Sequence, residues 1–453
     1  MTHGSKRHPF LRFVGVVAGV LVLVGAAAYL WLVGPGPTDF AGADRVALAD
    51  YHGADPTGAP PELAKADLVT RGQYLAQAAD CAACHTAKGG VPYAGGLAFV
   101  LPFGTLYSTN ITPDKDTGIG NYSDADFLNA VHRGIAPGGK RLYPAMPYAS
   151  YTALTDADAL AIKAFLFSLA PVNATANANT LKFPFDQRWA MAGWSLFFNS
   201  DRRFEPHSGR SDAWNRGAYL VEAAGHCGEC HTPRNLAQAL DNRSKFAGTV
   251  QAGWYAYNIS PDKASGIGAW SDEDLGRYLA LGQATLHGTA AGPMGEAVDD
   301  SLAHLTAGDI AAMVTYLKSV PAVASPDLPA VKAELASADY REGVPPDANP
   351  VGKHLFERSC IGCHGWTGQK PGMPFAALPG GRAVNDPTAT NVAAVVLFGA
   401  RRQTPHGIAT MPAFGAAYSD ADIADLVNYV TQRFGAAPSA LTAANIAAFR
   451  ANQ

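Results

Sequence analysis

The sequence has few charged residues, no cysteine outside a single repeated motif and no nucleotide-binding loop. Charged residues make up only 16% of the 453 residues, and the formal net charge is −4. Binding to nucleic acid depends on clustered Lys and Arg, so this balance gives no support for a nucleic-acid partner. No phosphate-binding loop or flavin fingerprint is visible either. The chain therefore offers no sign of nucleotide-dependent chemistry of its own.

The six cysteines all belong to one pattern, Cys-x-x-Cys-His, which occurs three times. The motifs consist of Cys81, Cys84 and His85, of Cys227, Cys230 and His231, and of Cys360, Cys363 and His364. A Cys-x-x-Cys pair alone also occurs in zinc sites and redox dithiols. Three copies that are each followed by His, with no cysteine left over, favour covalent attachment of c-type haem over zinc or disulfides. The sequence therefore predicts three haem c groups, each held by two thioethers and by the adjacent histidine as proximal iron ligand.

The N-terminal region combines a basic start with one long apolar run. Residues 1–12 are basic, and the uncharged segment 13–33 follows. As a helix this segment is about 31 Å long, which matches the hydrocarbon core of a bilayer. A cleaved signal peptide usually has a shorter apolar region that ends at a small-x-small site, whereas here Ala26-Ala-Ala is followed by five more apolar residues. We therefore favour an uncleaved transmembrane anchor over a signal peptide.

The charge bias of this anchor predicts its orientation. A basic end is normally retained in the cytoplasm, so the residues after about 34 are expected on the other side of the membrane. Covalent haem attachment in bacteria also takes place outside the cytoplasm. Both signals predict haem domains on the periplasmic side of the bacterial inner membrane.

The segments around the motifs repeat along the chain. Arg71-Gly-Gln-Tyr-Leu leads into the first motif, and Arg216-Gly-Ala-Tyr-Leu leads into the second. A fifteen-residue segment that starts at Asn110 returns with dense identity at Asn258. The third unit lacks that segment but keeps Gly352-Lys-His-Leu-Phe before its motif. These repeats indicate a duplicated domain and a shorter third copy.

Each unit is expected to close with one helix. These helices start at Thr155, Thr306 and Ser419, and each start is followed three residues later by Asp, as in a capping box. Apolar residues then recur at helical spacing, and a proline follows each helix. Loops rich in Gly and Pro argue against strand ladders. The predicted fold is mainly α, with an N-terminal transmembrane helix followed by three tandem class I-like cytochrome c domains.

The boundaries follow from these repeats. They are 1–12 for the basic N-terminus, 13–33 for the anchor, 65–172, 208–321 and 347–436 for the three domains, 173–207 and 322–346 for linkers, and 437–453 for a C-terminal tail. The first linker contains six large aromatic residues. They suggest either a docking surface for a partner or the membrane, or packing between the first two domains.

The methionines permit an elimination for the sixth iron ligands. Four of the seven are unsuited, being the first residue, one in the aromatic linker, one on a core helix face and one only nine residues after its proximal histidine: Met1, Met191, Met313 and Met373. Met146, Met294 and Met411 remain, one per domain, each expected in a loop before the closing helix. A thioether ligand raises the reduction potential of haem and suits electron transfer.

Each domain also contains a rival histidine, so a bis-His iron is the alternative. These rivals are His132, His287 and His406. A lone histidine is more often a hydrogen-bond partner of a haem propionate or of the core. Six arginines are candidate propionate partners because a guanidinium matches a carboxylate, with surface solvation as the alternative: Arg133, Arg141, Arg234, Arg382, Arg401 and Arg402.

At this point the sequence resembles the three-haem cytochrome c subunits of bacterial membrane-bound dehydrogenases. The resemblance covers nearly the whole chain after the anchor. Its most specific elements are Tyr93-Ala-Gly-Gly, Tyr107-Ser-Thr-Asn-Ile-Thr-Pro-Asp, Tyr143-Pro-Ala-Met-Pro-Tyr and Gly225-His-Cys-Gly-Glu-Cys-His-Thr-Pro-Arg. Carried over by position, the resemblance implies the axial pairs His85/Met146, His231/Met294 and His364/Met411. The uncleaved anchor departs from many members, which have a cleaved signal peptide.

The resemblance implies a function as an electron relay without substrate chemistry of its own. A separate catalytic subunit with flavin, pyrroloquinoline quinone or molybdenum oxidises an alcohol, aldehyde, sugar or sugar acid, and a small accessory subunit is a further expected partner. The cytochrome passes the electrons to ubiquinone in the membrane. One alternative is a free-standing anchored electron carrier. A multihaem peroxidase is the other, although it needs an open sixth position that a methionine in every domain argues against.

Overall fold

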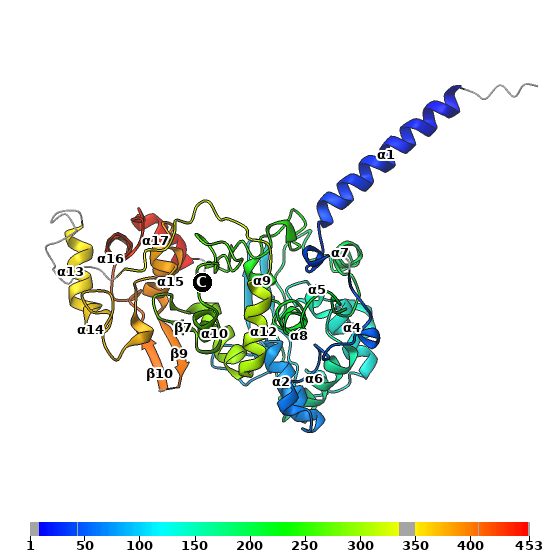
Figure 1. Cartoon of the computed structure of the whole chain (residues 1–453), viewed down its shortest axis with the longest axis horizontal. Coiled ribbons are helices and arrows are strands. Elements are labelled where there is room, and N and C mark those ends of the chain that lie inside the picture. Colours follow the sequence, from blue (N-terminus) through cyan, green and yellow to red (C-terminus); the bar gives the residue numbers. More distant parts are fainter. Residues whose placement is uncertain (1–8, 43, 335–348, 406, 452–453) are drawn as a thin grey trace, which may run out of the picture.

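The computed structural model of the protein describes residues 9–42, 44–334, 349–405 and 407–451. Residues 1–8 of the expected basic N-terminus, residues 335–346 of the expected second linker, and His406 lie outside the described residues. One long helix projects from a body that carries all three motifs (Figure 1).

The helices are named in chain order. The α-helices are α1 Pro9–Val33, α2 Leu68–Ala78, α3 Cys81–His85, α4 Asp124–Arg133, α5 Tyr148–Tyr151, α6 Asp156–Ser168, α7 Ala190–Phe198, α8 Asp212–Ala218, α9 Gly228–His231, α10 Asp272–Leu281, α11 Gly292–Asp300, α12 Ala307–Leu317, α13 Pro350–Ser359, α14 Ile361–His364, α15 Thr390–Phe398, α16 Asp420–Phe434 and α17 Ala443–Ala451. A π-helical turn, η5, spans Tyr219–Ala224.

The described residues include five short antiparallel hairpins besides the helices, and the expectation that strand ladders would be missing was wrong. They pair β1 Ala98–Leu101 with β2 Gly104–Tyr107, β3 Ile135–Ala136 with β4 Lys140–Arg141, β5 Thr249–Gln251 with β6 Trp254–Ala256, β7 Gln283–Ala284 with β8 Gly288–Thr289, and β9 Ala400–Thr404 with β10 Gly407–Met411. The glycines that argued against strands supply the positive φ angles of the turns between them, as at Gly138 and Gly253. The fold remains largely helical.

Helix α1 stands apart from the body. Its 25 residues are about 37 Å long. By length and composition it is the one helix among the described residues that is suited to cross a membrane. Its apolar side chains face outward, with Val22 and Leu23 each 70% exposed. No packing inside the body accounts for this apolar surface.

A glycine lies at the crossing of the first and closing helices of each unit. The helix pairs are α2 with α6, α8 with α12, and α13 with α16. A Cβ atom added at the glycine would lie about 2 Å from a backbone carbonyl oxygen of the closing helix, and the pairs are Gly72 with Ala161 at 1.9 Å, Gly217 with Ala312 at 2.0 Å and Gly352 with Asp425 at 2.2 Å. Only a residue without a side chain permits this approach. The crossing fixes where the intervening motif emerges.

The π-helical turn accommodates one extra residue in the second unit. Gly72 precedes Cys81 by nine residues, whereas Gly217 precedes Cys227 by ten. A π-helical turn accommodates one inserted residue, and the helical residues before and after it keep their positions. Because this π-helical turn lies directly before the second motif, the extra residue does not shift that motif relative to the helix crossing.

The first two units share one apolar core. One continuous cluster of buried side chains extends from Leu75 in α2 to Val320 after α12, and a separate cluster in the third unit extends from Leu355 to Ile446. Residues 34–42 and 44–64, for which no role was predicted, also pack on the second unit, where Phe40 contacts the rings of Trp214 and Tyr316. Units one and two therefore form a single packed body.

The C-terminal segment 437–453, expected to be a tail, contains the docked helix α17. Ile446 is fully buried against the third unit. Arg450 donates to the carboxylate of Asp420 at 2.5 Å and to the carbonyl oxygen of Gly415 at 2.6 Å. These contacts hold α17 beside α16.

Candidate haem sites

The three motif histidines share one hydrogen-bond arrangement. In each, Nδ1 lies within hydrogen-bond distance of a backbone carbonyl oxygen in the following loop, and the pairs are His85 with Thr109 at 2.7 Å, His231 with Tyr257 at 2.6 Å and His364 with Ala376 at 2.5 Å. A carbonyl oxygen only accepts, so Nδ1 carries the proton and Nε2 is left with a free lone pair. Histidine ligands of metals are oriented in this way.

Burial keeps these three imidazoles neutral. Burial lowers the pKa of all three histidines, because the charged form loses solvation there. A neutral imidazole is the form that binds a metal. Each of the three rings can therefore donate its Nε2 lone pair to a metal ion.

The first cysteine of each motif faces the apolar core, and all six thiols are unpaired. Burial raises the pKa of Cys81 and Cys227 to about 12 and that of Cys360 to about 11. These thiols are therefore neutral at physiological pH. Together with an imidazole whose Nε2 is free, two thiols three residues apart fit covalent haem, which supplies one-electron redox chemistry when bound.

The three candidate methionines pack against the same apolar clusters as the cysteines of their units. Met146 and Met294 adjoin the first cluster, and Met411 adjoins the second. Met146 lies in a turn, as expected. The expected loop was wrong for Met294, which lies in the first turn of α11, and for Met411, which ends strand β10. In both cases regular backbone fixes the side chain more firmly than a loop would.

The rival histidines that the structure describes contact acidic residues. The Nδ1 atom of His132 is 3.5 Å from Asp156, and burial lowers the pKa of His132 to about 4. His287 stacks on Trp270, and its Nε2 is 3.6 Å from Asp274. The contact of His287 involves its Nε2, whereas that of His132 involves Nδ1, so the methionines stay predictions for the sixth ligands.

Four of the six candidate arginines contact other protein groups. Arg133 pairs with Asp201, Arg234 pairs with Glu229, and Arg402 pairs with Asp299. Arg382 donates to the carbonyl oxygens of Pro329 and Ala264, at 2.6 and 2.7 Å. Most of these contacts join segments that are distant in sequence, so neither propionate pairing nor surface solvation had anticipated them.

Units one and two meet through a reciprocal pair of tyrosines. The Tyr74 hydroxyl, in α2, donates to Asp309 of α12 at 2.5 Å, and the Tyr219 hydroxyl, at the start of η5, donates to Asp158 of α6. Each hydroxyl also accepts from the backbone at the start of the same helix, at Thr306 and Thr155. The repeated Tyr of the Arg-Gly-x-Tyr-Leu segments was the sequence signal for this contact.

This arrangement corrects the expected capping boxes. Thr155 and Thr306 do cap their helices, by accepting from the backbone N–H of Asp158 and Asp309. A reciprocal box is present only at Ser419 among these three helix starts. In the other two, the aspartate side chain accepts from the neighbouring unit instead. The predicted helix start was right, and the predicted partner of the carboxylate was wrong.

The first and second motifs lie close to each other across this interface. Tyr151, five residues after Met146, places its ring edge-on to that of His226, at 5.2 Å between centroids. His226 directly precedes Cys227. Ser150 donates to Glu229, which lies inside the second motif, at 3.0 Å. The methionine loop of the first unit is thus joined to the haem motif of the second.

The second and third units are joined at a residue that also orients a motif histidine. The Tyr257 carbonyl accepts from His231, and the Tyr257 hydroxyl donates to Asp386 of the third unit at 3.0 Å. Arg402, which is 3% exposed on β9, donates to Asp299 and to the carbonyl oxygen of Ala290. The middle motif therefore contacts the first unit directly, through Glu229, and is linked to the third unit through Tyr257.

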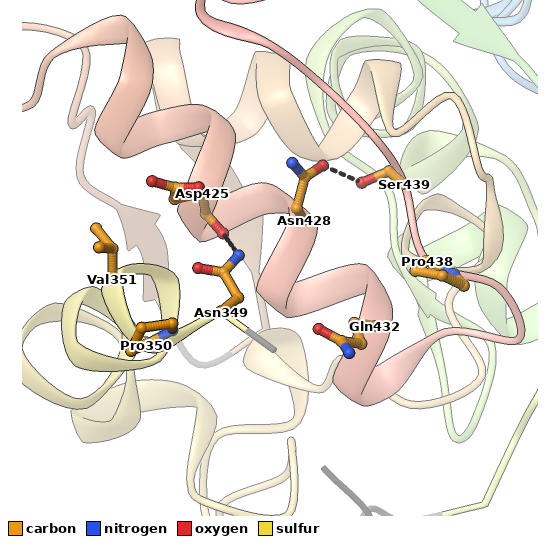
Figure 2. A pocket seen from close by; sticks show the side chains of 8 residues that line it. All are labelled: Asn349, Pro350, Val351, Asp425, Asn428, Gln432, Pro438 and Ser439. Atoms are coloured by element: carbon orange, nitrogen blue, oxygen red, sulfur yellow. Dashed lines mark hydrogen bonds between the residues drawn. The ribbon is translucent and has the colours of Figure 1, made fainter. Parts of the chain in front are cut away.

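A surface pocket on the third unit is separate from these sites. Figure 2 shows it between the start of α13, α16 and the segment that follows α16. Its polar groups bond to each other: Asn349 donates to the carbonyl oxygen of Asp425, and Ser439 donates to Asn428. None of the motif residues or candidate methionines lines it.

Comparison with known proteins identifies the type of domain. The family model described as Cytochrome c matches residues 69–170, and the one described as Cytochrome C oxidase, cbb3-type, subunit III, matches residues 347–430. Both matched segments contain one Cys-x-x-Cys-His motif.

Three curated relatives extend the similarity over most of the chain. The gluconate 2-dehydrogenase cytochrome c subunit of Pantoea cypripedii is 40% identical over 85% of this chain and 90% of its own length. The fructose dehydrogenase cytochrome subunit of Gluconobacter japonicus is 39% identical, over 88% and 86%. The cytochrome c subunit of the alcohol dehydrogenase (quinone) of Gluconobacter oxydans is 35% identical, over 84% and 82%. The chain belongs to this family of cytochrome c subunits of bacterial dehydrogenases.

Proposed function

We propose that the chain carries three covalent haem c groups, in three tandem cytochrome c domains, and relays electrons between a dehydrogenase and the membrane. The observation that carries this proposal is the arrangement repeated at His85, His231 and His364, in which Nδ1 donates to a carbonyl oxygen and Nε2 is free. Six thioethers would form through Cys81, Cys84, Cys227, Cys230, Cys360 and Cys363. Met146, Met294 and Met411 would complete the iron coordination.

The contacts between units support a relay that involves all three units, with the second unit in contact with both others. The second unit meets the first through Tyr151 and His226, and it meets the third through Tyr257. Buried side chains on both sides of each contact hold the units at fixed distances from one another, so few atoms have to move when an electron passes between them. The chain's own contribution is to hold the redox groups close together and to set their potentials through axial ligands and burial.

The expected electron donor is a catalytic dehydrogenase subunit that carries flavin, pyrroloquinoline quinone or molybdenum, with a small accessory subunit. The names of the relatives, which include subunits of gluconate, fructose and alcohol dehydrogenases, support this class of partner. The expected acceptor is ubiquinone. Helix α1 would hold the chain in the inner membrane with the haem domains on the periplasmic side.

Purification from native membranes tests this function. The tagged full-length chain, extracted in mild detergent, is expected to bring with it a catalytic subunit whose cofactor identifies the substrate class. Addition of that substrate should then reduce the haem absorbance of the complex. If the chain comes out alone and all dehydrogenase activity stays elsewhere, the subunit proposal fails and a free-standing anchored carrier takes its place. Carbon monoxide binding by the reduced protein would instead indicate an open iron and a peroxidase.

A further inference from the structure

The aromatic segment between the first two units forms an exposed apolar surface, here called the α7 surface. Its members, with their exposed fractions, are Phe183 at 80%, Phe185 at 46%, Trp189 at 74%, Leu196 at 78%, Phe197 at 44% and Leu236 at 84%. The opposite side of α7 is packed, since Ser195 is buried, and Trp194 meets the ring of Tyr148 and donates to the carbonyl oxygen of Ala237. The helix is therefore held firmly with one apolar side turned outward.

Helix α7 lies near the end of α1 that meets the body (Figure 1). The ring of Tyr29, four residues before the end of α1, lies 5.6 Å from the ring of Phe197. Asn235, next to Leu236, donates to the carbonyl oxygen of Leu32 at 2.8 Å. Two separate contacts thus fix the α7 surface to the last turn of the apolar helix.

The contacts with α1 determine how deep in the bilayer the α7 surface would lie. Tyr29 lies about 6 Å inside the end of α1, because each helical residue adds about 1.5 Å. If α1 spans the bilayer, a ring in contact with Tyr29 has to lie at the boundary between headgroups and acyl chains, the depth at which interfacial helices bind. The aromatic and leucine side chains of the surface match that environment.

We propose that the α7 surface is a second membrane contact, which inserts into the outer leaflet beside α1 and fixes the orientation of the haem domains against the bilayer. This inference rests on the proposed membrane-spanning role of α1. Arg243 stacks on Trp31 and pairs with Asp241, and Lys182 and Asp186 are both exposed, so the border of the surface is polar, like the headgroup region, while its apolar side chains make the contact. The occupant is thus the lipid of the membrane that holds α1.

A cleavable anchor separates this contact from α1 itself. A site for a specific protease is placed between Gly34 and Pro35 of the full haem-loaded chain, which is reconstituted into vesicles of phosphatidylethanolamine and phosphatidylglycerol. Flotation is measured before and after cleavage. The cleaved wild-type body is expected to stay with the vesicles, whereas Leu196→Glu is expected to lower its partition into lipid by at least about tenfold. Leu196→Asn serves as a milder variant, and the haem spectrum checks that each variant is folded.

Ile408→Glu is the matched control. Ile408 is 54% exposed on β10, on the opposite side of the body from α1 (Figure 1). The cleaved control is expected to float like the wild type. Release of the cleaved wild type, or equal retention of all variants, would overturn the inference. Release of the wild type combined with loss of a copurifying subunit in Leu196→Glu would assign the surface to a protein partner instead.

The same flotation experiment tests the α7 contact separately from the membrane-spanning role of α1. Failure of the uncleaved chain to float would overturn both the anchor role of α1 and the α7 contact. The relay function is judged separately, by copurification and haem reduction, and does not depend on flotation.

Discussion

Replacement of His231 by Ala is expected to stop electron flow through the chain. The variant loses the Nε2 atom that would bind the second iron, together with the hydrogen bond to the carbonyl oxygen of Tyr257. Loss of groups that merely orient a metal ligand already costs about 10–100-fold, so loss of the ligand is expected to lower substrate-driven ubiquinone reduction by at least about 100-fold. The effect is large because the second unit contacts both other units.

The control for this prediction is His52→Ala. His52 is exposed and lies before the first unit. Its loss is expected to leave the rate unchanged. The purified complex is assayed for quinone reduction, and a carbon monoxide difference spectrum reports whether one iron has become open. A His231→Ala complex that reduces quinone at the wild-type rate would remove the middle site from the relay.

The second large effect is expected at Asp309, in the interface between units one and two. Its two carboxylate oxygens accept from Nε and Nη2 of Arg216, each at 2.7 Å, and one of them also accepts from Tyr74. The Asp309 side chain is 5% exposed and that of Arg216 is 13% exposed. Asp309→Ala leaves a buried guanidinium without its counter-charge, which typically costs about 3–5 kcal/mol of unfolding free energy.

Urea denaturation of the body formed by units one and two measures this loss. Asp272→Ala is the matched control, because Asp272 is 81% exposed and lies 3.9 Å from Lys318. Its loss is expected to cost at most about 1 kcal/mol. Adding Arg216→Met to Asp309→Ala should restore part of the stability, because the uncompensated charge is removed. Equal midpoints for Asp309→Ala and Asp272→Ala would show that the buried pair does not stabilise the interface.

The local parts of the site could be predicted from the sequence. The cysteines and the histidine of each motif are neighbours in the chain, so their spacing alone indicates their chemistry. Helix starts at Thr155, Thr306 and Ser419 were also visible, because capping depends on residues only three apart. Two missed helices had comparable signals. Pro293 stands near the start of α11, and Thr442 lies three residues before Asn445 at the start of α17.

The long-range parts could not be predicted. Tyr74 and Asp309 are 235 residues apart, and Arg402 and Asp299 are 103 residues apart. Nothing within either local segment shows that the two partners meet. From the sequence alone, the carboxylates therefore fitted local capping boxes, and the arginines fitted propionate partners or solvated surface groups. Packing of whole units decides such pairs, which is why one shared core was also missed.

The central claim is that each Cys-x-x-Cys-His motif holds one covalent haem. The intact mass of the purified full-length chain, measured under denaturing conditions, tests it most directly, because only covalently bound haem stays with the polypeptide. The account predicts the mass of the polypeptide plus three haem groups. A mass with two haems, one or none would contradict it.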